Sequence, residues 1–97
     1  MKKAVFAQGA PAAIGPYSHG VAIGDLFFTS GQIALVPETG KLVDGGIQEQ
    51  TEQVLRNLEM VLSANGMTFA NVVKTTVFIT DLADFAEINR IYATRFP

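Results

Sequence analysis

The chain has 97 residues and a net charge of −2, with 48% hydrophobic and 16% charged residues. We expect one domain spanning 1–97, since this composition excludes a disordered segment and the length is short for two domains. The seven basic residues form no stripe, cysteine is absent and His19 is the only histidine, so nucleic-acid binding, disulfides and a histidine-rich metal site are not expected.

The N-terminal segment predicts a short strand followed by a stiff, irregular loop. Residues 3–7 favour a strand. In the stretch 9–16, Pro11 and Pro16 each fix φ and remove a backbone hydrogen-bond donor. The loop is therefore expected to be rigid without being helical or paired in a sheet.

The next segment predicts a hairpin. Apolar runs at 21–23 and 26–30 are separated by Gly24-Asp25, a two-residue link typical of type I′ or II′ turns. Residues 32–36 are expected to continue the second strand of this hairpin. Residues 37–40 then form a turn that ends on a glycine.

The clearest predicted helix covers residues 47–63. Its apolar side chains recur at helical spacing and form one face. Asp44 is a candidate N-cap, and Asn65-Gly66 provides the stop signal at the C-terminal end. The residues of the apolar face are Ile47, Thr51, Val54, Leu55, Leu58, Val61 and Leu62.

The C-terminal part predicts a strand and a second helix. Residues 72–80 are rich in β-branched side chains and alternate in character, which favours a strand. Asp81 is a candidate cap for the following helix, in which Phe85, Ile88 and Tyr92 share a face.

The order of these elements predicts an α+β fold in which two helices cover one face of one sheet. No apolar run reaches the ~20 residues of a membrane span, so we expect a cytoplasmic protein with no membrane partner.

The loop of residues 9–16 and the end of the hairpin suggest a small-molecule site. Tyr17 follows the loop, and Ser30-Gly31 forms a small polar step at the end of the second hairpin strand. Structural roles are alternatives for each residue. Tyr17 could pack under Pro16, Ser30 could satisfy backbone groups, and His19 is expected at the solvent rather than at the edge of the pocket.

Three stretches of the sequence resemble one protein family. APAAIGPYSHG at 10–20, TSGQI at 29–33 and VVKTTVFITDLADFAEIN at 72–89 are similar to segments of the Rid family of reactive-intermediate deaminases, also called the YjgF family. The resemblance covers the chain from about Ala10 onward.

The resemblance implies a chorismate-mutase-like fold, a homotrimer and a site at each subunit interface. It also implies hydrolysis of 2-imino acids, such as 2-iminobutanoate and 2-iminopropanoate, or their enamine tautomers, to 2-keto acids and ammonia, without metal or cofactor. Two alternatives remain open. One is a non-catalytic trimer that binds small 2-keto or 2-amino acids. The other is a ribonuclease or translation inhibitor, which the acidic balance of the chain disfavours.

The resemblance assigns substrate contacts to four residues. Tyr17 lines the pocket, Ser30 and Gly31 offer hydroxyl or backbone groups, and Asn89 reaches the site of a neighbouring subunit. Outside the resemblance, an asparagine on a helix is more often a surface residue or an interhelix hydrogen-bonding group.

Two further functional residues of the family lie beyond residue 97, so no catalytic residue is assigned in this chain. They are an arginine that holds the substrate carboxylate and a glutamate that positions the attacking water. The last two strands of the family fold are expected to be missing as well, which makes the single domain incomplete at its C-terminus. Arg90 and Arg95 are expected to face solvent, and we therefore expect weak or no catalysis from the 97-residue chain.

Overall fold

The computed structural model describes residues 1–96 and contains a three-stranded antiparallel sheet with strand order β1-β2-β3. The strands are β1 (Lys2–Val5), β2 (Gly20–Ile23) and β3 (Leu26–Thr29), and β2 pairs with both of the others. The predicted α+β class is confirmed, with this sheet and two α-helices. The first strand is shorter than predicted, because Ala7 lies in the loop after β1.

The predicted hairpin forms at Gly24-Asp25. Gly24 has a φ of 56°, Asp25 keeps a negative φ, and Ile23 lies opposite Leu26. A positive φ at the first central residue only is the pattern of a type II′ turn, whose twist matches that of the strands it joins.

The expectation that residues 32–36 continue β3 is wrong. β3 ends at Thr29, and the Ser30 N–H donates to the His19 carbonyl at 2.9 Å, one further step in the β2–β3 register, before the chain leaves the sheet. The turn that follows is confirmed, since Gly40 has a φ of 69° and donates to the Val36 carbonyl at 2.8 Å.

The long helix α1 (Ile47–Ala64) confirms the predicted helix almost residue for residue. Its N-cap is Gly46 and not Asp44, because the carboxylate of Glu49 reaches back to the Gly46 N–H at 2.8 Å. The helix ends at Asn65, and Gly66 takes a φ of 69°, as the Asn-Gly stop signal predicts.

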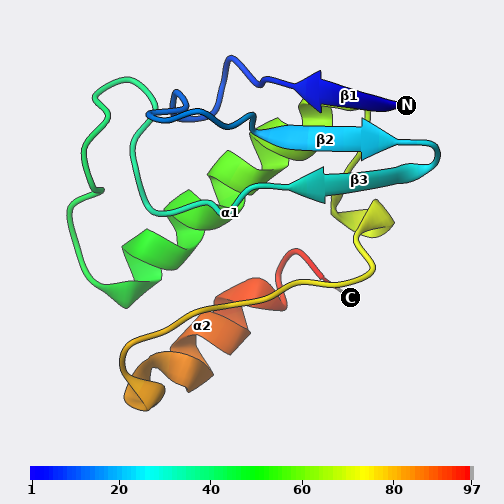
Figure 1. Cartoon of the computed structure of the whole chain (residues 1–97). Helices are drawn as coiled ribbons and strands as arrows, with labels where there is room; N and C mark the ends of the chain where they lie inside the picture. The colour runs from blue at the N-terminus through cyan, green and yellow to red at the C-terminus, as the bar shows by residue number, and fades with distance from the viewer. Residues whose placement is uncertain (97) are drawn as a thin grey trace.

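α1 crosses behind the sheet in Figure 1. A small hydrophobic cluster joins α1 to the loop after β1 and contains Ala7, Ala10 and the fully buried Val61, with Phe27 of β3 packed against it. This cluster fixes the loop that carries Tyr17 against the helix.

The second helix, α2 (Phe85–Tyr92), packs against α1. Asp81 caps the short 3-10 helix η2 (Leu82–Asp84) that leads into it, with its carboxylate accepting from the Ala83 N–H at 2.9 Å. Ile88 and Ile91 are the buried residues of α2.

Phe85 lies in the same helix as Ile88 and Tyr92, with which it was predicted to share a face, but its side chain is 60% exposed. Phe85 is the first residue of α2, beside η2, whereas Ile88 and Ile91 lie further along the helix. Helical spacing predicts which residues share a face, but it does not predict how much of that face the neighbouring helix α1 covers.

Residues 72–79 do not form the predicted strand. They follow the 3-10 helix η1 (Phe69–Asn71) as an irregular segment that runs beside α2, apart from the sheet (Figure 1). Val73 is 95% exposed and Phe78 93%. A strand needs a neighbour for its backbone donors and acceptors, and within residues 1–96 none of the three strands pairs with this segment.

Arg95 connects the end of α2 to α1. The prediction that Arg95 faces solvent is wrong. Its guanidinium donates to both carboxylate oxygens of Glu52, at 3.0 and 2.7 Å. This hydrogen bonding holds the pKa of Glu52 below its ordinary value of 4.5, against the opposing effect of desolvation. Arg90 faces solvent as expected, paired with Glu87 three residues earlier.

Replacing Glu52 by glutamine should cost about 1 kcal/mol of unfolding free energy at pH 7, because a bidentate, partly buried ion pair is lost. Glu87→Gln is the matched control, and it should change stability little because the Glu87–Arg90 pair is more exposed. Urea unfolding of the three proteins measures both effects. Equal losses in the two variants would contradict the assignment of Arg95–Glu52 as the stabilising pair.

The stabilisation by the Glu52–Arg95 ion pair should depend on pH. A carboxylate whose folded-state pKa is lowered stabilises the fold fully above its unfolded-state pKa, and this contribution is lost as pH falls through the lower folded-state pKa. The stability difference between the wild type and Glu52→Gln should therefore shrink on acidification below pH 4.5. A difference that stays constant would contradict this linkage.

Candidate functional site

Tyr17 lies at the end of the proline-containing loop. Its N–H donates to the Gly15 carbonyl at 2.8 Å, and its ring lies over Gly15, where an added Cβ would be 3.6 Å from the ring. The side chain is 45% exposed. The ring is therefore held by local backbone geometry and stays accessible to a ligand.

Ser30 connects this loop to the end of β3. Its hydroxyl donates to the Ser18 carbonyl at 2.7 Å, and its N–H donates to the His19 carbonyl at 2.9 Å. Gly31 is exposed, and the space where its side chain would stand is open. The fold thus brings Tyr17, Ser30 and Gly31 to one end of the sheet. Ser30 also satisfies backbone groups, which was its structural alternative.

His19 is buried, contrary to the prediction that it faces solvent. The residue is 4% exposed, and both ring nitrogens meet backbone groups at 2.8 Å. Nδ1 accepts from the Ala7 N–H, while Nε2 faces the Pro11 carbonyl and must donate to it. The neutral ring with its proton on Nε2 is the form that satisfies both partners.

Asn89 is exposed on α2, the helix that packs on α1. The other three predicted site residues lie around the hairpin. A single copy of the chain therefore does not place Asn89 in the same constellation as Tyr17, Ser30 and Gly31.

Asn57 was missed by the sequence analysis. It is 1% exposed and lies on α1, where its amide nitrogen donates to the carbonyls of Ile33 at 3.0 Å and Leu35 at 2.9 Å. Its oxygen accepts from the Gln53 amide at 3.0 Å. The available signal was that Gln53, Asn57 and the buried Val61 follow one another at four-residue spacing.

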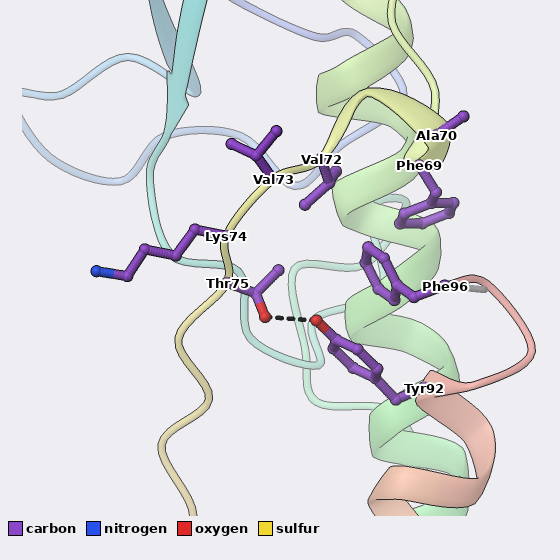
Figure 2. A pocket seen from close by; sticks show the side chains of 8 residues that line it. All are labelled: Phe69, Ala70, Val72, Val73, Lys74, Thr75, Tyr92 and Phe96. Carbon is purple, nitrogen blue, oxygen red and sulfur yellow. Dashed lines mark hydrogen bonds between the residues drawn. The ribbon is translucent and has the colours of Figure 1, made fainter.

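A separate hollow of about 280 Å³ lies between α2 and the segment after η1. Figure 2 shows the Tyr92 hydroxyl bonded to Thr75, with the Lys74 amine pointing away. Tyr92 stacks on Phe96 with ring centroids 4.2 Å apart. The hollow contains none of the predicted site residues; it is lined by Phe69, Ala70, Val72, Val73, Lys74, Thr75, Tyr92 and Phe96.

Residues 1–96 offer neither a metal-binding cluster nor a membrane-spanning helix. That part of the chain contains no cluster of three or more His, Cys, Asp or Glu side chains suited to holding a metal ion. No helix in the same range is long and apolar enough to cross a membrane.

Known proteins resemble this chain along nearly its whole length. The family model described as Endoribonuclease L-PSP matches residues 7–97. Reactive Intermediate Deaminase A, chloroplastic, from Arabidopsis thaliana is 49% identical over 99% of this chain and 51% of its own length. The 2-iminobutanoate/2-iminopropanoate deaminase of Mus musculus is 47% identical over 99% of this chain and 71% of its own.

Solved structures agree with these sequence matches. The Rid-family protein YyfA from Yersinia pestis superimposes with a TM-score of 0.95 at 43% identity, over 99% of this chain and 76% of its own. TdcF from E. coli, solved with bound serine, gives a TM-score of 0.90 at 44% identity, over 95% and 72%. This chain thus spans about half the length of the plant relative and 71–76% of the other three.

Both kinds of match cover almost every described residue, and the structural ones include the sheet, the helices and the Tyr17 loop together. The chain therefore belongs to the Rid, or YjgF-like, family, and its sheet and two helices are part of the family's chorismate-mutase-like fold.

Proposed function

We propose that this chain binds 2-imino acids at Tyr17, Ser30 and Gly31 and promotes their hydrolysis to 2-keto acids and ammonia. Water adds to the carbon of the C=N bond, the nitrogen takes up protons, and ammonia leaves as the C=O bond forms. The observation that carries the proposal is the pair of hydrogen bonds from Ser30 to Ser18 and His19. These bonds tie Ser30 to the two residues that follow Tyr17, in a chain 47% identical to a named imine deaminase.

The proposed roles follow from what each group offers. The Tyr17 ring or hydroxyl contacts the substrate, and the backbone at Ser30-Gly31 supplies polar groups. Asn89 is exposed and away from these residues, so we propose that it reaches the site of a neighbouring subunit in a homotrimer. The reaction needs no metal or cofactor in this proposal. We also propose a cytoplasmic location.

Two of the three arginines are engaged by glutamates and are not free to hold the substrate carboxylate. A carboxylate is best held by a bidentate arginine, but Arg95 is already paired with Glu52 and Arg90 with Glu87. We therefore propose that the 97-residue chain by itself is a weak catalyst.

The test supplies 2-iminobutanoate from a dehydratase and measures 2-ketobutanoate formation with and without the chain. The mouse deaminase is the positive control. We expect an acceleration far below that of the mouse enzyme. An acceleration close to it would contradict the proposed weakness, while binding without any acceleration would contradict the enzyme function.

The second candidate is a non-catalytic binder of small 2-keto or 2-amino acids at the same site. The structure of TdcF with bound serine favours it, because that relative is 44% identical to this chain. Calorimetry with serine and with 2-ketobutyrate separates the two functions when it is combined with the assay above. Tyr17→Ala should weaken binding, while Tyr92→Phe, in the separate hollow, is the control that should not.

A ribonuclease or translation inhibitor is the third candidate, and the family model's description is its main support. Affinity for RNA rests mainly on free basic side chains, and the net charge here is −2 with two of the three arginines paired to glutamate. An RNA affinity that falls steeply with salt would be needed to revive this candidate.

A further inference from the structure

The loop that carries Tyr17 is stiffened locally by its two prolines, but no regular secondary structure ties residues 11–18 to the rest of the fold. Residues 11–18 include no helix or strand, and Pro11 and Pro16 lack an N–H that could bond within the loop. A ligand contact made by Tyr17 requires a fixed loop, since a displacement of about 1 Å in a site can cost as much as 100-fold.

The His19 side chain supplies the missing cross-links. Its ring is buried between the end of the first strand segment and the start of the loop, and it bonds Ala7 on one side and Pro11 on the other, each at 2.8 Å. The Phe6 ring lies against it, with centroids 5.9 Å apart. The His19 side chain therefore holds both ends of the segment from Ala7 to Pro11, which precedes the Tyr17 loop.

The backbone of His19 also connects this loop to Ser30, at the end of β3. The His19 carbonyl accepts the Ser30 N–H, and the neighbouring Ser18 carbonyl accepts the Ser30 hydroxyl. We propose that His19 is a positioning residue, which sets the distance between Tyr17 and Ser30-Gly31 without touching the ligand. The proposal rests on the proposed function for its ligand, the 2-keto or 2-imino acid.

Two substitutions separate this role from simple filling of the core. His19→Leu keeps an apolar side chain of similar size but leaves the Ala7 N–H and the Pro11 carbonyl without partners. His19→Gln keeps one acceptor and one donor on two atoms joined through a single carbon, as the neutral ring does. A residue that only fills space is replaced better by leucine, whereas a residue that positions through hydrogen bonds is replaced better by glutamine.

The experiment titrates 2-ketobutyrate by calorimetry into the wild type and both variants, at a temperature where circular dichroism shows each to be folded. We expect about tenfold weaker binding for His19→Leu and binding near that of the wild type for His19→Gln. Equal affinity of His19→Leu and the wild type would overturn the proposal, as would a greater loss in His19→Gln than in His19→Leu.

Two measurements that need no ligand separate this proposal from the proposed function. Hydrogen exchange of the Ser30 amide should be fast in His19→Leu and slow in the wild type and His19→Gln. The imidazole ¹⁵N shifts of the wild type should show a protonated Nε2 and an unprotonated Nδ1. If the wild type binds no 2-ketobutyrate, the proposed ligand fails, and these measurements still decide the positioning. Unchanged Ser30 exchange in folded His19→Leu would overturn it, and a protonated Nδ1 in the wild type would overturn it even if His19→Leu does not fold.

Discussion

Replacing Ile91 by alanine is expected to lower the free energy of unfolding by about 3 kcal/mol, in the range found for buried Ile-to-Ala changes. Ile91 is 2% exposed and belongs to α2, which packs on α1. The smaller side chain removes contacts at the point where the two helices meet and leaves a cavity that the helices fill only in part. Urea unfolding followed by circular dichroism measures the loss.

Phe85→Ala is the matched control, because it removes a larger apolar side chain from the same helix. Its side chain is 60% exposed, so the loss should be well below that of Ile91→Ala. Helical spacing alone places Phe85, and not Ile91, on the apolar face, and would therefore predict the larger loss of stability for Phe85→Ala. An effect of Phe85→Ala as large as that of Ile91→Ala would contradict the packing described for α2.

Asn57→Asp should also destabilise the protein by about 3 kcal/mol at pH 7, although the two side chains have nearly the same shape. The change removes the amide that donates to Ile33 and Leu35, and it places a carboxylate against their two carbonyl oxygens. The Gln53 amide can still donate to one carboxylate oxygen, but a buried charge with a single neutral donor has a high desolvation cost, and the segment after Gly31 loses its two hydrogen bonds to Asn57 of α1.

Asn89→Asp is the control for this change, since Asn89 is exposed on α2 and should tolerate a carboxylate. Urea unfolding at pH 7 compares the two variants, and hydrogen exchange at residues 33–36 reports local release. Stability of Asn57→Asp should partly recover at acid pH, where the substituted carboxyl is neutral and can donate one hydrogen bond. Equal stabilities of the two variants at pH 7 would contradict the buried role of Asn57.

Several elements could be predicted because their signals are local. The Gly24-Asp25 hairpin, the helix ending at Asn65-Gly66 and the turn ending at Gly40 each depend on residues close together in sequence. A backbone angle or a helix end is fixed by steric limits on a few neighbouring residues, so one sequence is enough to recognise it.

The candidate site was only partly predictable. The grouping of Tyr17, Ser30 and Gly31 followed from the loop and the hairpin and stays a prediction, while the structure shows Ser30 bonded to Ser18 and His19. His19 and Asn57 were misjudged or missed, because histidine and asparagine side chains are usually exposed. Whether such a side chain is buried depends on partners 12 to 24 residues away, such as Ala7 and Ile33.

The sequence by itself determined the family, through the motifs that resemble it. It also determined the α+β class, the helix α1 and the turns, because these depend on composition, periodicity and local conformational limits. Only the tertiary structure decided that Arg95 binds Glu52, that His19 and Asn57 are buried, and that residues 72–79 remain unpaired within residues 1–96. Burial and pairing are properties of two segments at once, and the free energy of a polar group depends on which partner the fold brings to it.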